Sequence, residues 1–198
     1  MKENLINEKL KNNSSKELFE KAKQEGIFGS SFLGVGILTS NAPMYFDNGT
    51  ISAAMSIMSA IYLYKALKKF EQISNVSVHK FYKLSLVFSV IFLISYIATE
   101  FYSLYFAIPL AISAVCMAYA WFISTLKLAN ITRISNFKLY LILLTIDIIF
   151  ALYIRLAKID NEILIYTEFG LLVIIQIIYI SAWVKIENIK SEQPLACI

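Results

Sequence analysis

Four polar side chains in the second half of this largely apolar chain are of types that can bind a proton or a cation. Asp147 and Arg155 interrupt the run LILLTIDIIFALYIRL at residues 141–156, and Glu168 and Gln176 interrupt the next apolar run. An Asp at the centre of a membrane helix costs about 2.5–3.5 kcal/mol and usually faces the bundle interior or water. These four residues are therefore the candidate transport or ion-binding site.

Asp147 has no cationic partner at its own depth in the sequence. Arg155 follows it by eight residues, which is about 12 Å along a helix, and no other Lys or Arg falls in the middle of an apolar run. Burial without a cation favours the neutral acid. Asp147 would thus be protonated, bathed by a polar cavity, or paired with a bound cation. A purely structural role, bonding a neighbouring helix, stays open as the alternative.

The composition indicates that these residues belong to a membrane protein. The chain has 198 residues, of which 58% are hydrophobic and 16% charged, against about 25% charged in soluble domains, and its mean hydropathy is +0.65. A membrane-spanning helix needs about 20 apolar residues. We predict an all-α, polytopic helical bundle with about six transmembrane helices, at 27–46, 50–67, 84–99, 104–126, 139–155 and 163–184.

The distribution of charge predicts the orientation of the chain. Sixteen of the 18 Lys and Arg residues lie in the N-terminal tail, the second and fourth connections and the C-terminal tail, whereas only Arg155 and Lys158 fall on the other side. Because cytoplasmic segments carry the excess of Lys and Arg, both termini are expected in the cytoplasm, in a multi-pass protein of the cell membrane.

Three regions are expected along the chain. Residues 1–26 form a charged cytoplasmic tail, residues 27–184 the transmembrane domain, and residues 185–198 a C-terminal cytoplasmic tail. Ser14-Ser15-Lys16-Glu17 fits a capping box and predicts a short amphipathic helix before Gly26. That helix would lie on the inner membrane surface or dock a cytoplasmic partner, and a mostly disordered tail is the remaining alternative.

The last two apolar blocks suggest a helical hairpin of defined register. If the lysines that flank the hairpin at 138 and 185 lie at one depth, Asp147 is level with Gln176 and Arg155 with Glu168. This register predicts a hydrogen bond in the first pair and an ion pair in the second. Interhelical hydrogen bonds in membranes average only about 0.6 kcal/mol in one test system, so they would fix register more than they stabilise.

Small and polar residues mark other packing or pathway positions. Four of the six glycines lie in GIFGSSFLGVG, which predicts close helix packing, and Pro109 predicts a kink in the fourth block. Other polar groups that would complete a pathway lie in the third and fourth blocks: Ser85, Ser89, Ser95, Tyr96, Thr99, Ser113, Cys116 and Tyr119.

The residue types predict neither a cofactor nor an enzyme. His79 is the single histidine, and His, Cys and carboxylate residues do not fall at metal-ligand spacing, so no metal is expected. Gly-x-Ser-x-Gly is missing from the sequence, and no paired catalytic carboxylates are recognisable. The pI of about 8.9 is explained by membrane orientation and anionic lipid, so no nucleic acid is expected.

Two functions are compatible with these residues. The first is a small transporter or channel for protons, cations or a small solute, in which Asp147 is the exchangeable group. The alternative is a non-transporting membrane subunit or scaffold that docks a cytoplasmic or membrane partner. In both cases the expected surroundings are the lipid bilayer and either further copies of the chain or a partner subunit.

Overall fold

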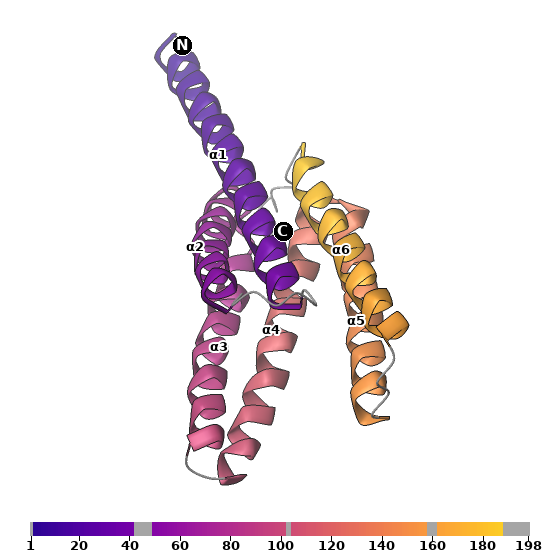
Figure 1. Ribbon diagram of the computed structural model, residues 1–198. Helices are drawn as coiled ribbons and strands as arrows, with labels where there is room; N and C mark the ends of the chain where they lie inside the picture. Colours follow the sequence, from indigo (N-terminus) through magenta and orange to yellow (C-terminus); the bar gives the residue numbers. More distant parts are fainter. Residues whose placement is uncertain (1, 42–48, 102–103, 158–161, 188–198) are drawn as a thin grey trace, which may run out of the picture.

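The protein is a bundle of six long helices, as the apolar blocks predict (Figure 1). A computed structural model describes residues 2–41, 49–101, 104–157 and 162–187. The helices run antiparallel to their neighbours in the chain, and the described residues form no strand. Their bounds are α1 Lys2–Asn41, α2 Gly49–Ser74, α3 Val78–Phe101, the 3-10 turn η1 Leu104–Phe106, α4 Ala107–Thr132, α5 Ser135–Leu156 and α6 Glu162–Val184.

Five of these helices, α2 to α6, are long and apolar enough to cross a membrane. Large apolar side chains also cover the outside of the bundle, as on α4, where Val115 is 69% exposed. A soluble protein would bury such a surface, whereas a bilayer is a suitable solvent for it. The chain is therefore a multi-pass membrane protein. The first predicted span, 27–46, is not among the five, and its last residues lie outside the described part of the chain.

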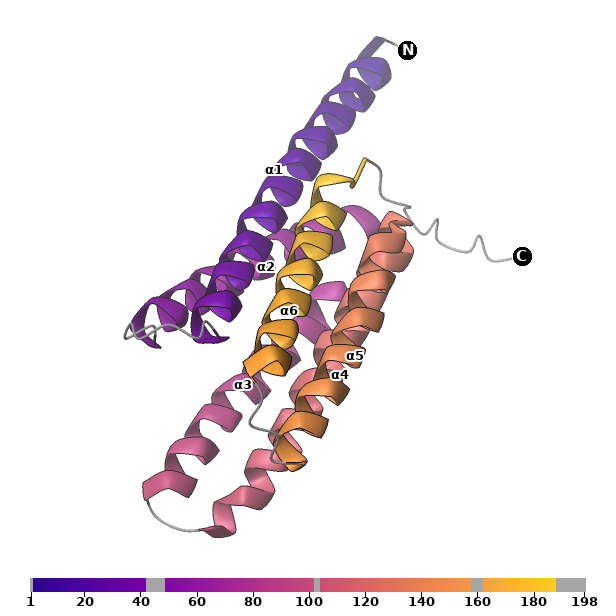
Figure 2. The same cartoon turned by 45° about the vertical axis from the view of Figure 1, so that its right-hand side comes forward.

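The N-terminal segment differs from the expectation of a separate short helix. α1 is one continuous helix of 40 residues, about 60 Å long, and its start projects past the rest of the bundle (Figure 2). The predicted helix start at Ser14-Ser15 is wrong, because both residues lie inside α1. Gly26 does not end the helix either: a single glycine costs only about 1 kcal/mol in a helix interior, and packing compensates for it here.

The glycines of α1 bring two other helices into close contact with it. A Cβ on Gly26 would lie 1.9 Å from the ring of Trp183 in α6, and one on Gly29 would lie 2.7 Å from Leu63 in α2. On the α2 side, the Ser52 hydroxyl also donates a 2.8 Å hydrogen bond to the carbonyl of Gly36. The predicted packing role of the glycine cluster is confirmed, and α1 uses different faces for α2 and α6.

Pro109 does not kink α4. It is the third residue of the helix, after the 3-10 turn η1. A proline in the first turn of a helix removes no intrahelical hydrogen bond, because the amide at that position has no partner within the helix. The prediction of a kink is wrong because α4 begins three residues later than the apolar block does.

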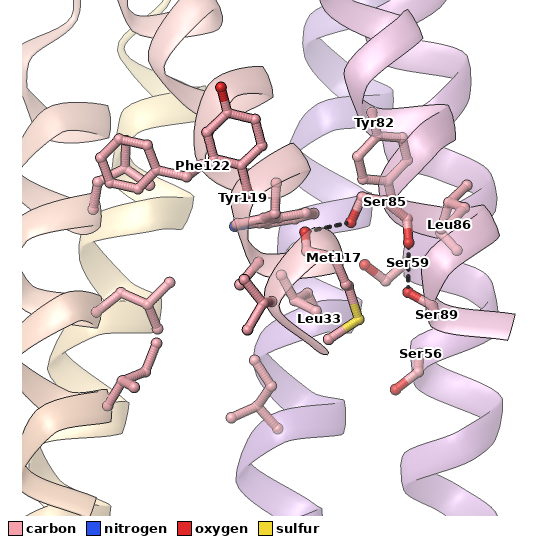
Figure 3. Close-up of a pocket in the computed structure, with 18 of the residues that line it drawn as sticks. Leu33, Ser56, Ser59, Tyr82, Ser85, Leu86, Ser89, Met117, Tyr119 and Phe122 are labelled. Carbon is pink, nitrogen blue, oxygen red and sulfur yellow. Dashed lines mark hydrogen bonds between the residues drawn. The ribbon is translucent and has the colours of Figure 1, made fainter. Parts of the chain in front are cut away.

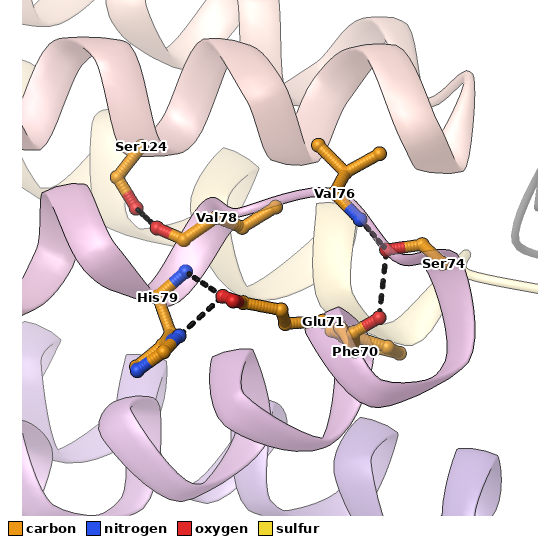
Figure 4. Close-up of polar contacts among 7 residues, drawn as sticks. All are labelled: Phe70, Glu71, Ser74, Val76, Val78, His79 and Ser124. Carbon is orange, nitrogen blue, oxygen red and sulfur yellow. Dashed lines mark hydrogen bonds and ion pairs between the residues drawn. The ribbon is translucent and has the colours of Figure 1, made fainter. Parts of the chain in front are cut away.

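The turn between α2 and α3 is held by polar side chains (Figure 4). α2 ends at Ser74, and the next residue, Asn75, has a left-handed φ of 59°. The Ser74 hydroxyl accepts a hydrogen bond from the amide of Val76. Glu71 forms an ion pair with the His79 ring and accepts a 3.2 Å hydrogen bond from the His79 backbone amide, which caps the start of α3. We call the end of the bundle with this turn and the α4–α5 turn the basic end.

Candidate functional site

The register of the α5–α6 hairpin decides which polar residues meet. Near the basic end, the Asn136 side-chain amide donates a 2.8 Å hydrogen bond to the Ser181 hydroxyl, and the rings of Tyr140 and Tyr179 lie 4.3 Å apart. These two contacts place Asp147 level with residues 170 to 172 of the antiparallel α6. That level is four to six residues, about 6–9 Å, from Gln176.

Asp147 is buried on α5 and lacks a complete set of polar partners. Its side chain is 5% exposed, and its Oδ1 has no hydrogen-bond partner within the described residues. Glu168 on the adjacent helix α6 lies two to four residues from the level of Asp147. No ion pair of Asp147 with a basic side chain occurs in the described part of the chain. A proton or a bound cation would offset the cost of burying the Asp147 carboxylate without a basic partner.

Gln176 is the second buried polar residue of this region. It is 2% exposed, and neither its Oε1 nor its Nε2 has a hydrogen-bond partner among the residues described. A Cβ on Gly34 would lie 3.5 Å from the Gln176 Cβ, so this side chain lies against α1. The predicted Asp147–Gln176 hydrogen bond is therefore wrong, because the hairpin register differs from the one inferred from its flanking lysines.

The other predicted pair stays a prediction. Glu168 is half-buried on α6, whereas the side chain of Arg155 lies outside the described part of the chain. Asp147 and Glu168 thus lie at nearby levels of adjacent helices, Gln176 lies against α1, and the Arg155–Glu168 ion pair is neither confirmed nor contradicted.

A cavity of about 1060 Å³ lies on another side of α5, between α1, α2, α3, α4 and α5. Thr145, Ile148 and Ile149 line it, but Asp147 does not. Of the polar side chains suggested for a pathway, Ser85, Ser89 and Tyr119 line the cavity. The remaining five predicted pathway residues are not in its lining: Ser95, Tyr96, Thr99, Ser113 and Cys116.

The α2 wall of this cavity carries two serines that our sequence interpretation did not assign to a site. Ser56 and Ser59 face the cavity opposite α4 (Figure 3). Ser56 belongs to a four-residue repeat of small residues that also indicates close packing, so the sequence signal was ambiguous. Ser59 is 2% exposed and follows Ser56 by nearly one helical turn, which was the available signal.

Aromatic side chains close the cavity toward the basic end. Tyr82 and Trp121 lie with ring centroids 5.6 Å apart, and Trp121 is 6.1 Å from Tyr179. The Trp121 Nε1 donates a 3.3 Å hydrogen bond to the Tyr140 hydroxyl, which joins α4 to α5. These contacts connect four helices, so the closed end is a rigid part of the core.

The described residues thus hold two separate features inside a membrane bundle, the buried Asp147 carboxyl and an uncharged cavity. Comparison with family models, with curated proteins and with solved structures gives no match to this chain.

Proposed function

We propose that this membrane protein is a small transporter or channel that moves protons or cations, alone or together with a small solute. The observation that carries the proposal is the buried Asp147 carboxyl, which has one oxygen unpartnered and no ion pair with a basic side chain among the described residues. Ionisable residues inside membrane helices are costly and usually mark ion or proton pathways. A site that is stable only with a proton or cation is one that can exchange it.

Flux measurements in proteoliposomes test this proposal. Full-length protein is reconstituted, and proton and cation flux are measured for wild type, Asp147→Asn and Glu168→Gln. Asn retains the shape and hydrogen-bonding capacity of Asp but does not titrate. We expect flux in wild type and at least a tenfold loss in Asp147→Asn, with a smaller loss in Glu168→Gln because Glu168 is less buried.

The control is Ser31→Ala, which removes a local hydroxyl bonded to the Ile27 carbonyl and leaves both carboxyls unchanged. It should retain wild-type flux. All variants are compared only after gel filtration and circular dichroism show equal folding. Absence of flux in folded wild type, or equal flux in wild type and Asp147→Asn, would refute the proposal. The search would then turn to a partner subunit recovered from native membranes.

Under this proposal the basic end and both termini face the cytoplasm, and the protein lies in the cell membrane. The lysine distribution supports this orientation: Lys68, Lys80 and Lys138 all lie at or beside turns of the basic end. Reporter domains that are active only on one side of the membrane, fused at each terminus, test it. Activity of an exterior reporter at either terminus would overturn it.

A further inference from the structure

The cavity that α1, α2, α3, α4 and α5 line is large, and no charged side chain lines it. Its volume of about 1060 Å³ is at the upper end of the range of about 300–1,000 Å³ for small-molecule sites. Its lining contains no Asp, Glu, Lys, Arg or His. Most of the surface is aliphatic or aromatic, as at Leu33 and Leu86. A charged ligand would lose its hydration here without gaining a counter-ion, so an occupant of this cavity is neutral.

The serine hydroxyls in the cavity wall differ in whether they form hydrogen bonds. Ser85 donates to the Met117 carbonyl at 3.3 Å and Ser89 to the Ser85 carbonyl at 2.9 Å (Figure 3). By contrast, the hydroxyls of Ser56, an exposed residue, and Ser59, a buried one, form no hydrogen bond within the described part of the chain. A hydroxyl beside an apolar cavity gains free energy when a ligand provides a partner for it.

The position of the opening indicates the source of the ligand. The basic end is closed by Tyr82, Trp121 and Tyr140. Elsewhere the lining includes side chains that are more than half exposed, such as Val90 at 58% and Ile149 at 63%. These residues lie within the membrane-spanning parts of α3 and α5. The open side of the cavity therefore meets the hydrocarbon of the bilayer.

We propose that this cavity binds a neutral lipid alcohol from the bilayer, with its hydroxyl head at Ser56 and Ser59 and its hydrocarbon chain along the apolar walls. The serine pair donates to and accepts from the head, while the uncharged lining excludes ionised lipids. The proposal does not depend on ion transport, because Asp147 lies outside the cavity.

The test is photo-crosslinking of the full-length protein in nanodiscs. Three probes carry the same diazirine and chain length: a long-chain alcohol, the corresponding alkane and the corresponding ionised fatty acid. Labelled peptides are identified by mass spectrometry. We expect the alcohol to label the cavity segments of α2, α3 and α4 roughly threefold to tenfold more than the alkane, as one or two retained hydrogen bonds imply. The fatty acid should label them least.

Matched variants test whether the selective labelling arises from binding in the cavity. Ala118→Phe fills it and should abolish the selective labelling, whereas Ala111→Phe, two turns away on the same face of α4 and outside the lining, should not. Replacing Ser56 and Ser59 together by Ala removes the head contacts but not the volume, so the alcohol should lose its advantage over the alkane. Ser113→Ala should leave that advantage unchanged.

The proposal is overturned by either of two results. One is equal labelling by alcohol and alkane in wild type. The other is a preference for the alcohol over the alkane that persists in both the Ala118→Phe protein and the double serine variant. If the Ala118→Phe protein does not fold, the double serine variant decides alone, because it removes two oxygen atoms and adds no bulk.

Discussion

Replacement of Gly26 by Ala tests whether α1 packs against α6 as closely as the structure shows. The new Cβ would lie 1.9 Å from Cε3 of Trp183, whereas ordinary contacts begin near 3.4 Å, so the indole must withdraw by about 1.5 Å. Trp183 is fully buried and cannot withdraw freely. Phe70 stacks on it with centroids 5.7 Å apart, and Phe137 meets it edge-on at the same distance.

The magnitude follows from two opposed effects. Overpacking a close-packed core costs about 1–3 kcal/mol, and an aromatic ring held by neighbours is at the upper end of that range. Ala gains about 1 kcal/mol over Gly in a helix interior. The net loss expected for Gly26→Ala is therefore about 2 kcal/mol in the free energy of unfolding. That loss is about a 30-fold change in the equilibrium constant.

Reversible unfolding in mixed micelles, followed by far-ultraviolet circular dichroism, measures this loss. Gly170→Ala is the matched control, because a Cβ there meets nothing within 4 Å. It should stabilise the protein by up to about 1 kcal/mol. Shortening Trp183 to Leu should make the Gly26→Ala change less costly than it is in the wild-type background. Equal unfolding free energies for the Gly26→Ala and Gly170→Ala proteins would refute the close contact.

Two further predictions concern the hairpin register and the α2–α3 turn. In a variant whose two native cysteines are replaced, the pair Asn136→Cys and Ser181→Cys should cross-link efficiently with a short bifunctional thiol reagent. The pair Lys138→Cys and Lys185→Cys should not cross-link. The opposite preference would contradict the observed register. Glu71→Ala should lower the unfolding free energy by about 1 kcal/mol, as loss of a helix cap does. Glu71→Gln should lower it less, because its amide oxygen still accepts the hydrogen bond from the His79 backbone amide. Equal losses in thermal unfolding would show that the charge of Glu71, and not its capping hydrogen bond, stabilises the turn.

The helices could be predicted because each apolar block has roughly the length that a bilayer demands. The glycine cluster also predicted close packing correctly, because a run of residues without side chains lets the backbone of a neighbouring helix approach closely. The predicted start of a separate helix at Ser14-Ser15 failed because a capping box is a local pattern. It cannot end a helix that the preceding residues already form.

The candidate site was less predictable because it depends on how helices are rotated and shifted against one another. The lysines at 138 and 185 suggested a register, but a lysine side chain can reach the interface from more than one turn of a helix. The contact between Asn136 and Ser181 sets a different register, which separates Asp147 from Gln176 in depth. The cavity required five helices to be placed, so no single block contained a signal for it.

The contacts of α1 with α6 constrain the order in which the bundle assembles. Gly26 and Gly34 in the first helix pack against Trp183 and Gln176 in the last one, more than 140 residues later in the chain. During synthesis α1 can pair with α2 as soon as both exist, but its second face has no protein partner until α6 has been made. Such long-range contacts form late. The final closure of the bundle therefore follows synthesis of nearly the whole chain, and truncation within α6 should leave the first five helices as an open, unclosed intermediate.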